Sequence, residues 1–403
     1  MCLLFSREVF HMETDIPAIE GEIERILPRV RDARRYLHAH PELSLREHET
    51  ARFVRSNLAS PNIGLLPPFL ETDVVALISG RQPGRNVTLR ADMDALPMRE
   101  ETELPHCSLR DNVMHACGHD GHTAMLMGAA LVLERLRNLF SGSVRCVFQP
   151  GEEIVAAGRD LVAAGVLDDP KPDAVLALHA WPGHPTGVIG SRPGVMMAAA
   201  DIFSITIRGR GGHGSRPERT IDPILVATRV IHSLYAIPSR RIGALEPVVI
   251  SVCSMHGGSN ANVIPDQVVL QGTARYLSPE GGALLPELFE QVLKAECDYA
   301  GASYHLEYQR PYIPTQNAAR VVDTCREVVL SGLGRSWWKD IPAPSMGAED
   351  FCWYLERCEG AMFFIGMGEE CPQLHSNRFD FNDGALRNGI MFLVLSALKL
   401  LRR

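Results

Sequence analysis

The sequence predicts an α/β protein, in which a mostly parallel sheet covered by helices carries an inserted α+β domain of ferredoxin-like type. Three observations predict this fold: short apolar segments alternate with helical ones, these segments are apolar on both faces, and the pattern changes near residue 197. Strands that are apolar on both faces are typical of parallel sheets buried between helices. A chain of 403 residues is also too long for one ordinary core, so two domains are expected.

The alternation begins in the first part of the chain. A charged, helix-patterned segment over 16–58 precedes four apolar segments, and a further helical segment separates the second of these from the third. In that segment Leu126, Ala129 and Leu133 recur at helical spacing, which predicts a helix over 125–136. The four expected strands are "VVALISG", "NVTLRADMD", "SVRCVFQPGEE" and "DAVLALHAWP".

The inserted domain is predicted over 197–309. Its elements follow the order strand, helix, strand, strand, helix, strand, which is that of the split ferredoxin-like unit. Asp222 caps its first helix, and Pro223 stands at the first helical position. Beyond it, "AMFFIGMG" and the terminal "GALRNGIMFLVLSALKLL" resume the earlier alternation. We therefore expect residues 1–196 and 310–403 to form one discontinuous domain.

Composition excludes several classes of protein. Hydrophobic residues make up 46% and charged residues 22%, and the net charge of −8 is spread without a basic block, so nucleic acid is not an expected partner. The N-terminal "MCLLFSREVFHMETD" lacks the features of a signal peptide, and no apolar stretch is long enough to span a membrane. The ten cysteines show no regular spacing and are expected to be reduced thiols, so we expect a cytoplasmic protein.

Side chains able to bind metal or transfer protons occur where the expected strands end. In open α/β sheets, ligands bind beyond the carboxyl ends of the strands. Each of these residues alone has an ordinary structural explanation, such as a turn cap or a core thiol, but together they favour a site. A thiolate, imidazoles and carboxylates suit one or two divalent ions. The residues are Asp92, Cys117, His119, Glu152, Glu153, His179 and His375.

The adjacent acids Glu152 and Glu153 indicate a division of labour. A carboxylate bound to a metal cannot readily also carry protons, because the metal occupies its lone pairs. One glutamate can therefore bind the metal while its neighbour holds a metal-activated water, takes its proton and passes it to a leaving amine.

At these residues the sequence resembles the dinuclear-metal aminoacylase and carboxypeptidase family. It is most similar to the branch of hippurate hydrolases, N-acyl-L-amino acid amidohydrolases and auxin-conjugate (IAA-amino acid) hydrolases. The resemblance implies a phosphorylase/hydrolase-like catalytic domain with an inserted lid that usually forms the dimer interface. The matching stretches run in family order over nearly the whole chain: "LHAHPELS", "LRADMDALP", "MHACGHDGHTAMLMGAA", "FQPGEE", "LHAWP", "GRGGHGSRP", "NVIPD", "GTAR", "SMGAEDF" and "LHS".

The resemblance also implies roles for the strand-end residues. Cys117 matches a ligand that bridges two ions, Glu152 matches the general base, and Asp92 matches an aspartate that orients a ligand. "RAD" at Arg90 to Asp92 departs from the His-x-Asp of the wider family, as expected for this branch. Two divalent ions are implied, zinc first, with manganese, cobalt or nickel as alternatives. The remaining matched ligands are His119, Glu153, His179 and His375.

Residues of the expected lid and of "SMGAEDF" match positions that contact substrate. His213 matches a histidine that polarises the scissile carbonyl, often in the partner subunit. Asn262 and Arg275 match residues that hold the substrate carboxylate, and Gly347 is assigned to substrate binding with them. A turn histidine, a turn asparagine and a strand-face salt bridge remain the ordinary alternatives.

The expected activity is metal-dependent cleavage of the amide bond of N-acyl-L-amino acids by a homodimer or a tetramer. A metallo-dipeptidase or carboxypeptidase with the same dinuclear site is the main alternative. A binding protein that retains the fold and a thiol-redox protein centred on Cys117 are more distant ones, since Glu152 is present and no resolving cysteine lies near Cys117. The acyl group is not defined by the sequence.

Overall fold

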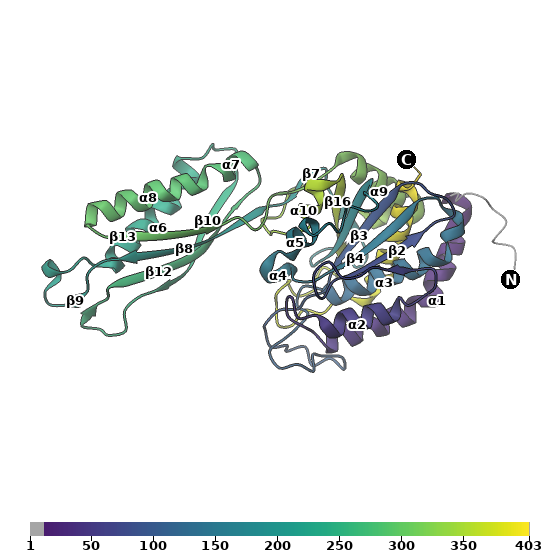
Figure 1. The fold of residues 1–403 in the computed structure, drawn as a ribbon, viewed down its shortest axis with the longest axis horizontal. Helices are drawn as coiled ribbons and strands as arrows, with labels where there is room; N and C mark the ends of the chain where they lie inside the picture. The colour runs from purple at the N-terminus through teal and green to yellow at the C-terminus, as the bar shows by residue number, and fades with distance from the viewer. Residues whose placement is uncertain (1–11, 403) are drawn as a thin grey trace. The chain divides into compact units, whose positions relative to one another are not determined.

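The computed structural model describes residues 12–402, which divide into two compact units (Figure 1). The first unit holds the residues up to Met196 together with Gln316–Ala343 and the chain from Asp350 onward. The second unit consists of Met197–Thr315 and Pro344–Glu349. The N-terminal segment 1–11, which includes most of the stretch predicted not to be a signal peptide, lies outside the described residues.

The first unit is built on an eight-stranded sheet with the order β1-β2-β4-β3-β5-β16-β6-β15. The four expected strands form β2, β3, β4 and β5. Three of them lie within two residues of the predicted bounds, and β4 ends four residues before the predicted segment does. Every residue of β3 and β16 is buried, as expected for central strands covered on both faces. The strands are β1 (Gly64–Leu65), β2 (Val74–Ser79), β3 (Asn86–Asp92), β4 (Ser143–Gln149), β5 (Ala174–Trp181), β6 (Ile189–Ser191), β15 (Trp338–Asp340) and β16 (Gly360–Gly366).

This sheet is mixed rather than mostly parallel. The central strands β4, β3, β5 and β16 are parallel, but β2 pairs antiparallel with β4, and β6 pairs antiparallel with β16. The sequence pattern could not reveal this difference, because hydrophobicity on both faces reports burial and not strand direction. The parallel centre still brings four carboxyl ends to one edge, which is the feature that positions the site.

Helices bury the sheet of the first unit. Helices α1, α3, α9 and α11 pack on one another, and α3 also lies against β2, β3, β4 and β5. Ala129 and Leu133 of α3, at the predicted spacing, are fully buried in the same hydrophobic core as Leu89 and Leu176 of the sheet. The helices are α1 (Met12–Ala39), α2 (His48–Asn57), α3 (His119–Arg135), α4 (Glu152–Val155), α5 (Ala157–Ala163), α9 (Ala319–Gly332), α10 (Cys352–Arg357) and α11 (Leu386–Leu400).

The second unit has its own core beneath a four-stranded antiparallel sheet with the order β10-β12-β8-β13. Asp222 caps α6 as predicted, because its carboxylate accepts the backbone N–H of Ile224. Short strands β7 (Gly194–Met197) and β14 (Thr315–Asn317) pair where the chain passes from one unit to the other. The elements are β8 (Ala199–Arg208), β9 (Gly212–His213), α6 (Pro223–Arg240), β10 (Val248–His256), β11 (Val263–Ile264), β12 (Gln267–Tyr276), α7 (Pro279–Ala283), α8 (Leu285–Ala300) and β13 (Ser303–Gln309).

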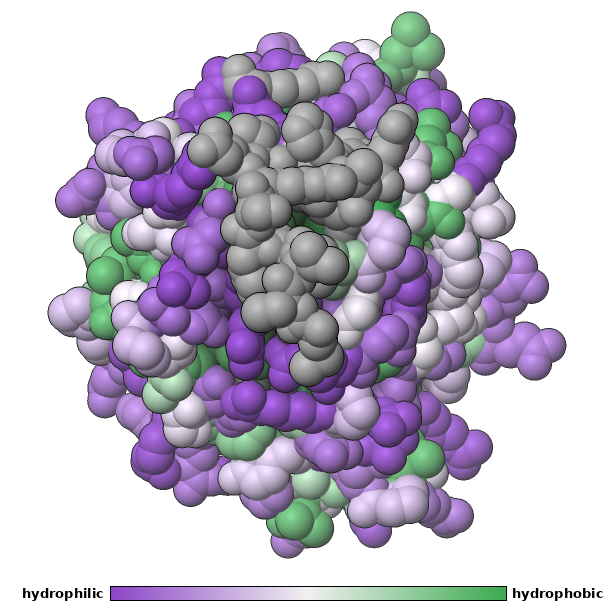
Figure 2. All heavy atoms as spheres, turned by 90° about the vertical axis from the view of Figure 1, so that its right-hand side faces the viewer, coloured by the Kyte–Doolittle hydropathy of each residue, from purple (hydrophilic) through white to green (hydrophobic). Residues whose placement is uncertain are grey.

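The surface shown in Figure 2 is mostly hydrophilic, with hydrophobic residues scattered singly between polar ones. Scattered apolar residues of this kind are normal on protein surfaces. Within residues 12–402, none of the helices combines the length and the hydropathy that a membrane crossing requires.

Candidate metal centre

The carboxyl ends of the parallel strands place the predicted residues on one edge of the sheet. Asp92 is the last residue of β3, and His179 lies near the end of β5. Glu152 and Glu153 open α4, which two intervening residues separate from the end of β4. His375 lies in the loop that follows β16. The sequence therefore predicts correctly which strand ends carry these side chains.

The loop that carries Cys117 is shorter than the sequence predicts, because α3 begins at His119 and not near residue 125. Gly118 precedes the helix with a φ of +86°, a left-handed conformation that favours glycine. A Cβ at Gly118 would also lie 2.9 Å from the Cβ of Ala180 in β5. This close approach brings His119, at the amino end of α3, to the edge where β5 ends.

The structure brings together the five side chains predicted as metal ligands. The Cys117 Sγ lies 3.6 Å from the His179 Nε2. The Glu153 Oε1 lies 3.8 Å from the His119 Nε2 and 3.3 Å from the His375 Nε2. The sulfur of Cys117 also lies within 4.8 Å of ligand atoms of His119 and Glu153. His375 is 54% exposed and the other four are largely buried, so the cluster is open to solvent on one side.

Two buried atoms of this cluster lack a hydrogen-bond partner among the described residues, and a cation would satisfy both. The His119 Nε2 and the Glu153 Oε1 are buried, and among the described residues neither has a hydrogen-bond partner. Buried polar atoms are nearly always hydrogen-bonded, so each such atom needs an explanation. A metal ion would accept a lone pair from both atoms, and sulfur, imidazole and carboxylate are ordinary donors to zinc and related ions.

The electrostatics of the cluster also favour a cation. Burial would lower the pKa of His119, but the carboxylates of Asp92 and then Asp94 outweigh it, and this pKa rises to about 10. Burial raises the pKa of the Cys117 thiol well above its usual value, and Glu153 raises it further. A reactive thiolate needs a lowered pKa, so this environment does not fit a thiol-redox protein. A bound metal ion would supply the missing positive charge and allow the thiol to ionise.

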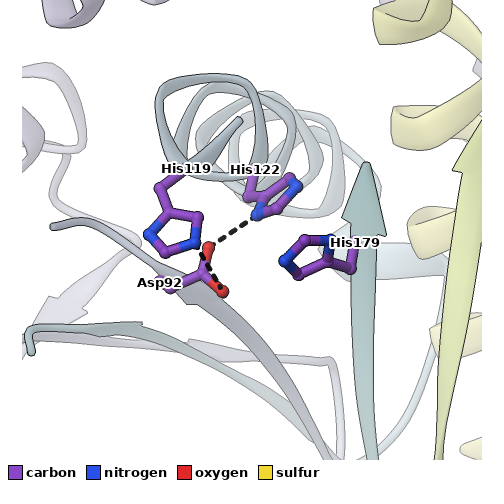
Figure 3. A group of neighbouring side chains, drawn as sticks. All are labelled: Asp92, His119, His122 and His179. Atoms are coloured by element: carbon purple, nitrogen blue, oxygen red, sulfur yellow. Dashed lines mark hydrogen bonds and ion pairs between the residues drawn. The ribbon is translucent and has the colours of Figure 1, made fainter. Parts of the chain in front are cut away.

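Figure 3 shows the neighbouring cluster of Asp92, His119, His122 and His179. The His122 Nδ1 donates a hydrogen bond to the Asp92 Oδ1 at 2.6 Å, and its Nε2 accepts the backbone N–H of Ala180 at 2.7 Å. Because both ring nitrogens are engaged, His122 has no lone pair left for a metal. Asp92 therefore orients His122 directly, while its other oxygen lies 3.8 Å from the His119 Nε2.

Sequence reasoning missed Asp94, which is the direct partner of His119. The His119 Nδ1 donates to the Asp94 Oδ1 at 3.2 Å, which leaves the Nε2 directed at Glu153. A usable signal was present in "DMD", because residues two apart on an extended chain face the same side. Asp92 and Asp94 therefore both point toward α3.

Glu152, the predicted general base, is buried and directly precedes Glu153 in α4. Its charge raises the pKa of the Cys117 thiol, after burial and Glu153. Gly151 before it has a φ of +66°, so the chain turns sharply from β4 into α4. This turn places two successive carboxylates at the sheet edge, one of which, Glu153, contacts the ligand histidines.

The four remaining predicted residues lie in the second unit. His213 in β9 is exposed, and its Nδ1 lies 2.8 Å from the Ser215 Oγ. Asn262 is its neighbour, since the Asn262 carbonyl accepts the N–H of Gly214 and β11 pairs with β9. Arg275 in β12 donates to the Met346 carbonyl at 2.8 Å, which places its guanidinium beside Gly347. The structure thus groups His213 with Asn262 and Arg275 with Gly347.

A buried cluster of sulfur, imidazole and carboxylate groups with an adjacent acid, at the carboxyl edge of an α/β sheet, can hold metal ions beside a proton-transfer group, as a metal-dependent hydrolase requires. Residues 88–399 match peptidase family M20/M25/M40, and the chain belongs to this family. It is therefore an enzyme that acts on amide bonds.

Three similar proteins illustrate the range of the family. The N-acyl-L-amino acid amidohydrolase of Geobacillus stearothermophilus is 42% identical over 73% of this chain and 81% of its own length. Thermostable carboxypeptidase 1 of Saccharolobus solfataricus is 34% identical over 95% of this chain and 98% of its own. The solved structure of the Bacillus subtilis YXEP protein, described as a dinuclear metal binding peptidase, has a TM-score of 0.80 and 33% identity, covering 94% of this chain and 99% of that one.

Proposed function

We propose that the protein hydrolyses the amide bond of N-acyl-L-amino acids and releases a carboxylate and a free amino acid. The observation that carries the proposal is the convergence of five donor side chains beside a second, adjacent carboxylate at one sheet edge. The similarity to an N-acyl-L-amino acid amidohydrolase supports the same substrate class. We propose a cytoplasmic location for it.

Five side chains would hold two divalent ions in this site. By the family resemblance, Cys117 would be the ligand shared by both ions, and its sulfur lies within 4.8 Å of ligand atoms of His119 and Glu153. Zinc is the first choice for a mixed thiolate, imidazole and carboxylate set, and manganese, cobalt or nickel would also fit. Such ions polarise a carbonyl and lower the pKa of a bound water. The other ligands in this proposal are His119, Glu153, His179 and His375.

Glu152 would carry the proton in this reaction. Its carboxylate takes the proton of the attacking water and delivers it to the leaving amine nitrogen, so the amide C–N bond breaks as the new C–O bond forms. Asp92 would hold His122, and through it the end of β5 that carries His179, because the His122 Nε2 accepts the Ala180 N–H.

Residues 197–309, which make up most of the second unit, would serve as a ferredoxin-like lid and dimerisation domain, as the family resemblance implies. In this proposal His213 donates a hydrogen bond to the substrate carbonyl oxygen, from its own or a partner subunit. Asn262, Arg275 and Gly347 would hold the substrate carboxylate. Arginine suits that role because its fork of N–H donors matches two carboxylate oxygens.

A substrate comparison tests the proposed activity. We expect the metal-loaded enzyme to hydrolyse N-acetyl- and benzoyl-amino acids at least about tenfold faster, in kcat/KM, than free dipeptides of the same amino acids. Release of the free amino acid is measured directly in both cases. Preference for the free dipeptides would contradict the proposal.

A metallo-dipeptidase or carboxypeptidase is the second candidate, and the similarity to the Saccharolobus carboxypeptidase favours it. A dipeptidase requires a free α-amine on the acyl side of the scissile amide bond, whereas an aminoacylase cleaves the same bond when the acyl group carries no such amine. A carboxypeptidase would remove the last residue from longer peptides. An N-blocked tripeptide, added to the same comparison, would therefore be hydrolysed by a carboxypeptidase but not by a dipeptidase.

Replacement of Cys117 tests the metal ligands. We expect Cys117→Ser to weaken metal binding by more than about 100-fold, because a serine hydroxyl stays protonated and even loss of an outer partner costs about 10–100-fold. Elemental analysis of the purified variant measures the metal retained. Cys146→Ser is a matched control. The Cys146 thiol is buried in the same unit and belongs to none of the metal-binding groups found among the described residues. Unchanged metal content in Cys117→Ser would remove the cysteine from the ligand set.

A further inference from the structure

The stretch "HPELSLRE", which overlaps the matched "LHAHPELS", has no part in the proposed reaction. Its residues 40–47 form the connection between α1 and α2, and Leu45 within it has a φ of +62°. Two of its polar side chains, Ser44 and Glu47, reach the strands and loops that carry the metal centre. Their contacts suggest what the stretch does.

Ser44 contacts the carboxylate of Asp94, and both oxygens of this carboxylate accept hydrogen bonds. The Asp94 Oδ1 accepts the His119 Nδ1–H at 3.2 Å. The Asp94 Oδ2 accepts the backbone N–H of Glu153 at 3.0 Å and the Ser44 hydroxyl at 2.6 Å. Asp94 is 1% exposed, so water cannot replace these donors. One carboxylate thus joins a proposed imidazole ligand to the backbone of a proposed carboxylate ligand.

Glu47 contacts the turn that precedes Glu152 and Glu153. Its Oε1 accepts the backbone N–H of Gly151 at 2.9 Å and that of Leu45 at 3.0 Å, and its Oε2 accepts the Thr72 hydroxyl at 2.9 Å. The side chain is fully buried. Gly151 is the turn residue before Glu152. Glu47 therefore fixes the turn between β4 and the two glutamates that open α4.

We infer that Asp94 and Glu47 are positioning residues, which fix the His119 imidazole and the 151–153 segment in the arrangement that binds metal. The inference rests on the proposed metal site. Asp94 keeps the proton of His119 on Nδ1, so that the lone pair of Nε2 faces Glu153. Partners of this kind tune metal ligands through orientation, and their loss weakens metal binding without removing a ligand.

The geometry requires a carboxylate at position 94. An asparagine has the same shape but only one acceptor oxygen, so it can serve either His119 or the N–H of Glu153 but not both. At position 47 the requirement is weaker, because the Oε1 alone accepts both backbone N–H groups. Glutamine at position 47 therefore keeps the Gly151 contact, and alanine loses it.

The test measures zinc binding by full-length protein in competition with a chromophoric chelator. Asp94→Asn should raise the Zn²⁺ dissociation constant by about 10–100-fold. Glu47→Ala should also raise it, while Glu47→Gln should stay within about twofold of the original protein. The absorption spectrum of the Co²⁺-loaded proteins gives a second readout, because it should change for Asp94→Asn while the ligands themselves are all present.

Asp73→Asn is the matched control. The Asp73 carboxylate is equally buried in the same unit and accepts two backbone N–H groups, those of Phe69 and Leu70, but contacts none of the proposed ligands. The Asp73→Asn variant should be less stable than the original protein but bind zinc with the same affinity. Equal zinc affinity of Asp94→Asn and the original protein, or equal weakening in Asp73→Asn, would overturn the inference.

Two further outcomes keep the inference apart from the proposed function. If the original protein itself binds no zinc or cobalt, the proposed metal site fails, and the positioning role fails with it. If Asp94→Asn does not fold, the Glu47 pair decides, since unchanged zinc affinity in Glu47→Ala contradicts the inference and weakening that Glu47→Gln reverses supports it.

Discussion

Glu152→Gln should lower kcat by about 10²–10⁴-fold, the usual contribution of a positioned general base, and leave the metal content unchanged. Glutamine keeps the size of the side chain, but its amide cannot take a proton from water. The five proposed ligands are untouched by the substitution, and glutamine occupies the same space as the buried glutamate at the amino end of α4. Steady-state kinetics and elemental analysis of the same preparation measure the two effects.

Glu153→Gln is the matched comparison, because the two glutamates are adjacent and differ in what they contact. The Glu153 Oε1 lies near the imidazoles of His119 and His375, so this variant should lose metal and activity together. The pair of variants therefore separates proton transfer from metal binding. Normal turnover in Glu152→Gln would rule out the proposed general base, and loss of its metal would make Glu152 a ligand.

The position of the candidate site could be predicted from the sequence, because the ends of the apolar segments mark the ends of the strands. "AVLALHA" places a histidine where an apolar run ends, and "RCVFQPGEE" places two acids just beyond another. Parallel strands then bring such ends to one edge, whatever the remaining strands do. The mixed direction of the outer strands therefore leaves the prediction of the site intact.

The supporting contacts could not be read in the same way. The contact between Glu47 and Gly151 joins residues 104 positions apart, and it depends on a left-handed turn at Leu45 that no pattern of hydrophobicity reveals. The start of α3 at His119 depends on the approach of Gly118 to Ala180, which is likewise a tertiary contact. Periodicity reports which face of an element is buried, whereas these features depend on what lies opposite.

Arg90→Met should lower the free energy of unfolding by about 3–5 kcal/mol, because it removes one partner of a buried charge network. The Arg90 guanidinium donates to the Asp92 Oδ2 and the Asp350 Oδ1, both at 2.7 Å, and to the Gln149 Oε1 at 3.0 Å. All four side chains are at most 3% exposed. The residue that departs from the His-x-Asp pattern is thus bound to carboxylates, and its loss would leave their negative charge buried without this compensation.

Arg320→Met is the control for the charge network. Arg320 also pairs with a carboxylate, that of Glu359, but both side chains are about half exposed, so its loss should cost less than about 1 kcal/mol. Urea unfolding of the two variants in chelator compares them without metal. Adding Asp350→Asn to Arg90→Met should recover part of the loss, because it removes one of the uncompensated charges. If Arg90→Met lowered the free energy of unfolding as little as Arg320→Met does, the buried charge network would not stabilise the fold. Arg90 would then contribute only the volume of its side chain.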